Sequence, residues 1–453
     1  MINVKTLSKI YPDALKSQTL TPIQLISLHL LLHKPTGDGD SKDPTFGPFI
    51  STMPQDFSEH PLMWSVNQTL NTGDTFLGSI LTEATPPSVQ EQVTNLTSRF
   101  WQDWKAISQY VHSKPEVMST TSREIVANLL PEGGLALDYV WAWLNVNTRC
   151  IYYQIDRSAS SPSNVTLCPI LDFANHIPFN TELVPILPSG NPTHFRTPTI
   201  SLSGSRPIPK GKIGGDYAFT SSGYLELEED QEIHLCYGAH PNRKLFVEYG
   251  FVNLFPQGSI VDGMDTANRN GEVEVDDLVS ALFEERGSVG EWMREVLEEE
   301  GYWGYCPSHV FPDCFANHLW CISDWTLHSS PWPAYPSFRL TTALKLLHLF
   351  GPELQEVPTH PEKLLSPWKD VINGITYTIS PENEEKWRDT LRRLCELITQ
   401  RAHQGIEEIV KHHTSGRPEW FSFAKQNIRC LWQEELEVSQ AVLKTLRSGE
   451  VFG

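Results

Sequence analysis

The sequence predicts an α+β fold in which a helical part, a part with short strands and a second helical part follow one another. Three observations predict this order. Apolar residues recur at helical spacing up to about Asn147, and short apolar pieces alternate with Gly, Pro, Ser and Asn from about Val165 to Asn253. Helical spacing then returns and continues to the end of the 453 residues. This length suits one large domain or two ordinary ones.

The first predicted helix opens at Thr21-Pro22, which supplies a capping residue and a proline at the first helical position. The apolar run IQLISLHLLLH follows it. A loop rich in Gly, Asp and Pro extends from about Lys34 to Pro48. Loop and helix together begin a helical segment that we place over residues 20–150.

Two further helices are predicted within that segment. Ser88 and Glu91 have the spacing of a capping box. Behind them, apolar residues fall on one helical face: Val93, Leu96, Phe100, Trp101, Trp104 and Ile107. The run LALDYVWAWLNVN, residues 135–147, predicts a helix that ends near Arg149.

The β part is expected to hold short strands and turns within VTLCPILDFANHIPFN, TISLSG and GYLELEEDQEIHLCYG. The stretch from Thr181 to Asp216 is rich in Pro, Gly and Ser and predicts a surface insertion. After a boundary near residues 254–272, an all-helical domain is predicted over 272–453. Its last helix, within Trp420 to Leu446, has an apolar stripe and acidic residues on its other faces.

Charge and hydropathy narrow the class of protein. The chain has 35 basic and 55 acidic residues, a net charge of −20, which argues against direct nucleic-acid binding and suits a basic protein substrate. It has no apolar run of 18 residues, so no membrane span is predicted. The N-terminal residues lack the layout of a signal peptide. We expect an intracellular monomer, in the cytoplasm, the nucleus or both.

The eight cysteines are scattered, form no CxxC pair and are predicted to be reduced thiols. One group resembles a zinc site only in composition: Cys306, His309, Cys314, His318 and Cys321. Its spacing fits no familiar zinc layout, and aromatic residues crowd around it, so no metal is predicted.

Two segments of the β part carry the functional signal. The first is DFANH, residues 172–176, and the second is YGAHPNRKLFVEYGFV, residues 237–252. Taken singly, the first is most simply a turn that bonds to itself, and the second an aromatic side chain packed over a turn. In this order and about sixty residues apart, the two are far more specific.

With these two segments the sequence resembles the SET-domain methyltransferases. The match is to the subgroup of the Rubisco large-subunit lysine methyltransferase, ribosomal-protein lysine methyltransferases and an actin histidine methyltransferase. The family threads the two segments through each other in a knot-like arrangement beside S-adenosylmethionine. TRCIYY, residues 148–153, resembles the end of the family's helical insertion. The resemblance implies a SET domain over 1–253, with its core at 165–253, followed by a helical substrate-binding domain.

The resemblance implies transfer of a methyl group from S-adenosylmethionine to a lysine of a non-histone protein, ribosomal or other. Such an in-line displacement depends on orientation and on a neutral amine, which an apolar channel ending in a tyrosine hydroxyl can favour. Tyr237 is assigned as that catalytic and cofactor-contacting tyrosine. Tyr249 is expected to wall the channel and touch the cofactor.

Four more residues are assigned to the cofactor by the same resemblance. Asn175 and His176 are expected to hold its adenine and amino-acid portions, largely through backbone contacts. Asp172 is expected to fix the turn, and Arg149 to pair with the cofactor's carboxylate. Arg149 as a surface arginine and Asp172 as a turn anchor are the simpler alternatives.

One departure from the family keeps other functions open. No strand with a Gly-x-Gly turn precedes the helical insertion, and Gly37-Asp38-Gly39 lacks a flanking strand. MINVKTLSKIYPD resembles the stretch that follows those strands, so we expect the chain to start inside the SET domain. The alternatives are a catalytically impaired SET-fold scaffold that binds proteins, and a histidine methyltransferase of the same fold. In-frame sequence upstream of Met1 that encodes a Gly-x-Gly strand would favour the enzyme.

Overall fold

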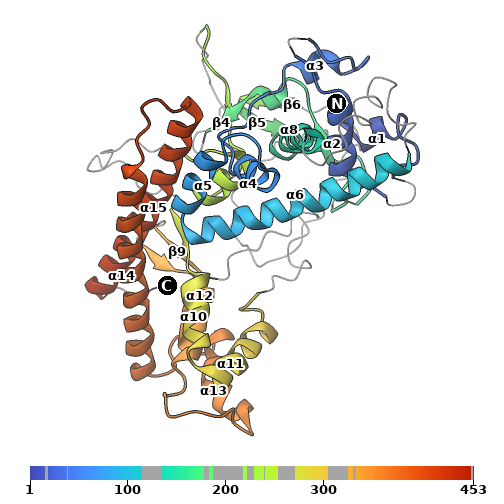
Figure 1. The fold of residues 1–453 in the computed structure, drawn as a ribbon. Coiled ribbons are helices and arrows are strands. Elements are labelled where there is room, and N and C mark those ends of the chain that lie inside the picture. The colour runs from blue at the N-terminus through green and yellow to red at the C-terminus, as the bar shows by residue number, and fades with distance from the viewer. Residues whose placement is uncertain are drawn as a thin grey trace.

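The structure is a computed structural model that describes residues 1–15, 19–37, 39–114, 134–158, 160–177, 183–186, 218–221, 229–238, 240–253, 271–304, 325–329, 333–449 and 452. It is a mostly helical α+β fold with small sheets. Figure 1 shows one helical group around α6 (Pro87–Ser113) and α8 (Gly134–Arg149), and a second from α10 (Asp276–Glu284) to α13 (Pro361–Ile372). The long helices α14 (Pro381–Lys411) and α15 (Glu419–Ser448) run beside both groups. The predicted order of helical, β and helical parts is confirmed for the described residues.

The N-terminal helices are α1 (Val4–Leu7), α2 (Pro22–Leu32), α3 (Gly47–Ser51), α4 (Pro61–Leu70), α5 (Thr75–Ala84), α6 (Pro87–Ser113) and α8 (Gly134–Arg149). Helix α2 begins as predicted, because Thr21 and Gln24 form a capping box and Pro22 is its first residue. The predicted capping box at Ser88 is wrong. Helix α6 begins two residues earlier than predicted, at Pro87 with Pro86 as its cap, so Ser88 already lies inside the helix and cannot cap it.

Aromatic packing joins α6 to α8. Phe100 of α6 lies 5.6 Å from the ring of Tyr139 and 5.9 Å from that of Trp143, both on α8. The indole N–H of Trp143 donates to Asp103 of α6 at 2.9 Å, so the buried indole keeps a polar partner. This packing fixes the direction of α8 and therefore the position of its last residue, Arg149.

The strands of the β part are short: β1 (Ile2–Asn3), β2 (Ile151–Tyr152), β3 (Val165–Leu167), β4 (Asn175–His176), β5 (Leu183–Ile186), β6 (Ala218–Ser221) and β7 (His234–Leu235). They form an antiparallel sheet in the order β1-β3-β2, an antiparallel pair β5–β6 and a parallel pair β4–β7. Of the predicted insertion from Thr181 to Asp216, only β5 lies within the described residues.

The β part does not end in a strand. Residues 242–249 form helix α9 (Asn242–Tyr249), which follows Pro241 and ends at Gly250 with φ +82°. The prediction of strands and turns up to Asn253 is therefore wrong here. The proline at the N-cap and the glycine in the left-handed region are ordinary helix boundaries, which the sequence analysis did not use.

The C-terminal helices are α10 (Asp276–Glu284), α11 (Gly287–Glu299), α12 (Phe338–Leu347), α13 (Pro361–Ile372), α14 (Pro381–Lys411) and α15 (Glu419–Ser448). Three strands, β8 (Glu272–Glu274), β9 (Thr326–His328) and β10 (Tyr335–Pro336), form an antiparallel sheet among them. The prediction of an all-helical C-terminal part is therefore wrong. The strands are two or three residues long, too short to show an alternating pattern in the sequence.

Two buried clusters form the core of the described chain. One lies among the N-terminal helices and the other among α10 to α13. Helices α14 and α15 contribute to both: Phe421 and Trp432 belong to the first cluster, and Leu391 and Val442 to the second. Helices α14 and α15 therefore pack against both helical groups.

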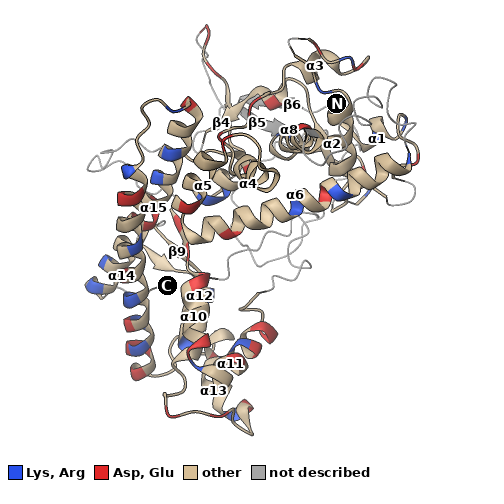
Figure 2. Cartoon of the chain, viewed as in Figure 1, with Lys and Arg blue, Asp and Glu red and all other residues tan. Residues whose placement is uncertain are grey.

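The surface of the long helices is charged (Figure 2). On α14 the charges pair one turn apart, as in Lys386 with Glu382 at 2.6 Å and Arg392 with Glu396 at 2.8 Å. Such exposed pairs contribute little stability each. Among the described residues, no helix combines the length and the apolar character needed to cross a membrane.

Candidate functional site

A parallel strand pair brings together the two segments that carry the functional signal. Asn175 of β4 lies opposite His234 of β7, and His176 lies opposite Leu235. The N–H of Ile177 also donates to the carbonyl of Leu235 at 3.2 Å. The expectation that residues 172–176 and the segment from Tyr237 lie side by side is confirmed. A separation of more than roughly 15 Å between the Cα atoms of Asn175 and Tyr237 would have contradicted this expectation.

Tyr237 is fixed at both ends by the DFANH turn. Its backbone N–H donates to Nδ1 of His176 at 3.1 Å, and its hydroxyl donates to the carbonyl of Ala174 at 3.0 Å. The ring of His176 lies 5.1 Å from that of Tyr237. Burial raises the pKa of Tyr237, and nearby Asp172 raises it while Arg149 opposes. The hydroxyl therefore stays protonated at neutral pH and can orient a ligand, but it cannot act as a base there.

Arg149 meets the same turn from the end of α8. Its Nη1 donates to the carbonyl of Asp172 at 3.1 Å and lies 3.4 Å from the Asp172 carboxylate. Ile170, two residues before Asp172, has φ +75°, an unusual value for a β-branched residue, so the turn is held under strain. Burial raises the pKa of the Asp172 carboxyl, and the Arg149 guanidinium opposes that shift. The pair locks α8 to the turn.

The side chain of Asn175 lies on the outside of the site. Its Nδ2 donates to Glu232 at 2.6 Å, and the residue is exposed. The turn is thus held by the backbone pairing of β4 with β7. The Asn175 side chain therefore points away from the turn's interior, and only the backbone of Asn175 remains available for the predicted cofactor contact.

Aromatic rings surround the Tyr237 side chain. The ring of Tyr249, the last residue of α9, lies 5.4 Å from that of Tyr237 and 6.0 Å from that of Phe251. The ring of His176 lies 5.8 Å from that of Phe251. Burial raises the pKa of Tyr249, with Glu248 and Tyr237 adding to the shift. The predicted wall residue therefore does lie beside Tyr237.

Three buried polar atoms near the turn lack a hydrogen-bond partner among the described residues. They are Nε of Arg149, Oδ1 of Asp172 and Nε2 of His176. Buried polar atoms are normally satisfied, and leaving one unpaired costs about 1–3 kcal/mol. One donor, one acceptor and one imidazole nitrogen at a single turn indicate where a polar molecule would complete the structure.

The support of α9 was missed by the sequence analysis. Nδ1 of His60 accepts from the N–H of Leu62, so its Nε2 carries the proton and donates to the carbonyl of Glu248 at 3.1 Å. Nδ2 of Asn427, on α15, donates to the carbonyl of Gly250 at 3.2 Å. His60 and Glu248 are 188 residues apart in sequence, and Asn427 and Gly250 are 177 apart, so no local sequence pattern predicts either contact.

Glu248, the residue before Tyr249 in α9, has a buried carboxyl 3.5 Å from Nη2 of Arg99. Burial raises its pKa to about 7, although Arg99 and Lys244 oppose the shift. A carboxyl whose folded pKa is raised stabilises the fold at acid pH, and that contribution is lost as the pH rises from 4.5 to about 7.

We therefore expect Glu248→Gln to remove the loss of stability that accompanies ionisation of the buried carboxyl as the pH rises. The free energy of unfolding of the variant, relative to the parent, should rise by about 2–3 kcal/mol between pH 4.5 and pH 8, as measured by urea unfolding. Glu407→Gln, at an exposed position of α14, is the matched control and should show no such trend. A difference between Glu248→Gln and the parent that does not change with pH would contradict the assignment.

Comparisons with known proteins agree with this geometry. No protein-family model matches the chain. It is 24% identical over 373 residues to human SET domain-containing protein 4, covering 80% of this chain and 67% of that protein. It is 28% identical over 165 residues to the ribosomal lysine N-methyltransferase set11 of Schizosaccharomyces pombe, covering 36% of this chain and only 30% of that protein.

The fold matches a solved structure, the SET domain of LSMT bound to lysine and AdoHcy. The TM-score is 0.52 at 16% identity, and the match covers 99% of this chain and 79% of that one. The match includes the C-terminal helical part. By sequence and by fold, the chain is a relative of the SET-domain lysine methyltransferases of the Rubisco LSMT, ribosomal lysine methyltransferase and SET domain-containing protein 4 type.

Proposed function

We propose that the chain transfers a methyl group from S-adenosylmethionine to a lysine side chain of a non-histone protein. The observation that carries the proposal is the parallel pairing of β4 with β7. It holds the Tyr237 hydroxyl and the His176 ring against one turn, inside a group of aromatic rings. The relatives named as ribosomal lysine methyltransferases support lysine and a ribosomal or other non-histone protein as the substrate.

The residues at the turn fit the cofactor. Bound S-adenosylmethionine would supply the sulfonium methyl group. Its amino-acid portion carries a carboxylate and an ammonium, which complement the unpaired Nε of Arg149 and the unpaired Oδ1 of Asp172. His176 would add a ring contact and its unpaired Nε2. Asn175 would contribute its backbone, since its side chain is engaged by Glu232.

The acceptor amine must be neutral to attack. A free lysine has a pKa of about 10.4, and an apolar environment disfavours its charged form. Tyr237, Tyr249 and Phe251 would supply that environment, and the protonated hydroxyl of Tyr237 would orient the amine toward the methyl group. A histidine acceptor requires the same orientation, so substrate peptides with each residue should be compared.

The finer organisation belongs to the same proposal. We infer that residues 172–176 and 237–252 thread through each other in the knot-like manner of the family. We assign 1–253 to the SET domain, with the helical insertion at 20–150, and 272–453 to substrate binding. Helix α15 supports this assignment because it joins the two parts: Nδ2 of Asn427 donates to the carbonyl of Gly250, next to Tyr249. A substrate seated on the C-terminal helices would then lie near Tyr249.

The proposal is tested by titrating the folded, full-length protein with S-adenosylhomocysteine in a calorimeter. We expect binding, and we expect Arg149→Gln to weaken it at least about tenfold, or about 1.4 kcal/mol. Arg157→Gln is the matched control, because Arg157 is exposed on the loop after β2. Absence of binding by a folded protein that includes an upstream Gly-x-Gly strand would rule out the enzyme. Equal effects of the two variants would remove Arg149 from the cofactor site.

A SET-fold scaffold is the second candidate. The observation that favours it is that Arg149 is already engaged by Asp172, so the guanidinium is only partly free for a cofactor. A scaffold would bind protein partners without binding S-adenosylhomocysteine. The same titration therefore separates the two functions.

A further inference from the structure

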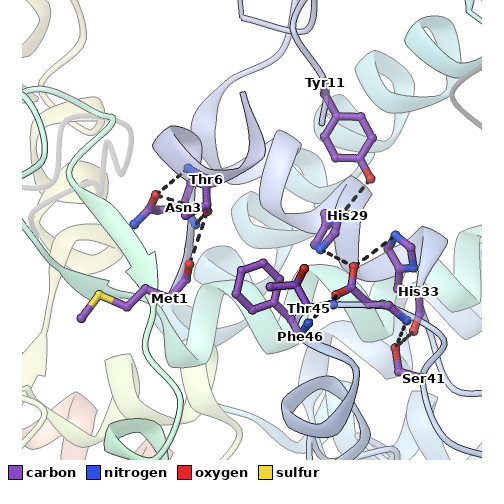
Figure 3. Close-up of polar contacts among 10 residues, drawn as sticks. Met1, Asn3, Thr6, Tyr11, His29, His33, Ser41, Thr45 and Phe46 are labelled. Atoms are coloured by element: carbon purple, nitrogen blue, oxygen red, sulfur yellow. Dashed lines mark hydrogen bonds and ion pairs between the residues drawn. The ribbon is translucent and has the colours of Figure 1, made fainter. Parts of the chain in front are cut away.

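Two histidines and an aspartate converge at the end of α2, away from the site described above. His29 lies in the last turn of α2, His33 caps the C-terminus of that helix, and Asp43 lies in the loop before α3. Figure 3 shows the two imidazole rings facing the same carboxylate oxygen. One ligand atom from each residue lies within 4.8 Å of the others.

The two separations from Asp43 are long for hydrogen bonds and close to the spacing of ligands around a shared zinc ion. Nε2 of His29 lies 3.4 Å from Oδ2 of Asp43, and Nε2 of His33 lies 3.6 Å from the same atom. An N–H···O bond is normally 2.7–3.2 Å, so neither contact is a good one. Ligands about 2.0–2.1 Å from a tetrahedral zinc ion are about 3.3–3.5 Å apart, whereas an octahedral ion such as magnesium would need about 3.0 Å.

The site is buried and one of its atoms lacks a partner. His29 is fully buried, and its Nε2 has no hydrogen-bond partner within the described part of the chain. The side chain of Asp43 is only 2% exposed. A buried carboxylate with two neutral imidazoles has a net negative charge, which a divalent cation would offset.

The surrounding contacts orient these ligands. Nδ1 of His29 lies 3.0 Å from the hydroxyl of Tyr11, which leaves Nε2 as the ligand nitrogen when Nδ1 carries the proton. Oδ1 of Asp43 accepts from the N–H groups of Thr45 and Phe46, and this fixes the carboxylate with Oδ2 toward the histidines. The hydroxyl of Ser41 donates to the carbonyl of His33 at 2.7 Å and ties the loop to the helix end (Figure 3).

We propose that His29, His33 and Asp43 bind one zinc ion that clamps the loop before α3 to the end of α2. Two imidazoles and a carboxylate are ligands that zinc accepts, and three protein ligands leave one position for water. That water would enter beside His33, whose side chain is 25% exposed. The ion would therefore stabilise the fold of the helical part.

The test measures zinc binding by the full-length protein purified without a polyhistidine tag and stripped with a chelator. We expect one zinc per chain by elemental analysis and calorimetry, and a melting temperature that rises with added zinc. His33→Ala should weaken binding by about 10²-fold or more and abolish the rise. Tyr11→Phe should weaken binding by about 10-fold, the usual effect of losing an outer partner.

His413→Ala is the matched control, because His413 is exposed after α14 and should leave binding unchanged. His33 is partly exposed, so its loss should not unfold the protein, and circular dichroism of the stripped variant checks this. If the folded parent binds no zinc, the proposal is overturned and the three residues are only a packed polar cluster. Equal zinc affinity of His33→Ala and the parent would overturn it as well.

Discussion

Tyr237→Phe is expected to lower the rate of methyl transfer by about 10²–10³, or about 3–4 kcal/mol in the activation barrier. The substitution removes one hydroxyl and leaves the ring that packs against His176 and Tyr249. If that hydroxyl orients the amine, turnover should fall far more than the affinity for S-adenosylmethionine. Single-turnover rates and a separate calorimetric titration of the cofactor measure the two effects.

The fold should tolerate this change. The hydroxyl donates to the carbonyl of Ala174, and losing one such bond costs about 1 kcal/mol of unfolding free energy. Tyr249→Phe is the matched comparison on the opposite ring and should affect the rate less. A Tyr237→Phe protein that keeps full methyl transfer would show that the catalytic tyrosine is misassigned, with Tyr249 the next candidate.

Trp432→Ala is expected to lower the free energy of unfolding by about 3–5 kcal/mol. Trp432, on α15, is 5% exposed, and its indole N–H donates to the carbonyl of Ala84 at 2.7 Å. A Cβ atom at Gly405 of α14 would lie 2.2 Å from this indole, so the two helices meet closely there. The alanine variant would open a cavity and leave the carbonyl at the end of α5 unpaired. Urea unfolding measures the loss.

Two variants separate the causes of that loss. Trp432→Phe keeps most of the ring volume and loses the N–H, so it should cost about 1–3 kcal/mol. Trp420→Ala removes a half-buried tryptophan from the first turn of the same helix and should cost clearly less than Trp432→Ala. Equal losses for Trp420→Ala and Trp432→Ala would mean that the contact of Trp432 with α5 and α14 adds no stability beyond that of a half-buried tryptophan.

Much of the helical framework was predictable, because periodicity and capping are local. Thr21 and Pro22 mark the start of α2, and the run from Leu135 predicts α8 to within two residues at its end. Helix α9 and the strands β8 to β10 were not predicted, since a short element is decided by its tertiary partners. Glu272 of β8, for example, pairs with Arg243 of α9.

The candidate site was predictable only through the resemblance of its two segments to a family. Composition alone does not place Tyr237 beside His176, because some sixty residues separate them. The contacts that support the site were beyond reach for the same reason: His60 with Glu248, and Asn427 with Gly250, join remote segments. His29 and His33 show a spacing of four residues, but the position of Asp43 depends on the path of a loop.

The sharing of α14 and α15 between the two cores limits how such proteins can be recombined. Phe421 and Trp432 complete the N-terminal core, whereas Leu391 and Val442 complete the other one. A cut near residue 253 would strip the first part of those side chains and expose the apolar faces of α5 and α9. A chimaera that takes its C-terminal part from another relative should therefore retain residues 402–436 of this chain, which complete the N-terminal core. Only the helices of the second core, α10 to α13, should be exchanged.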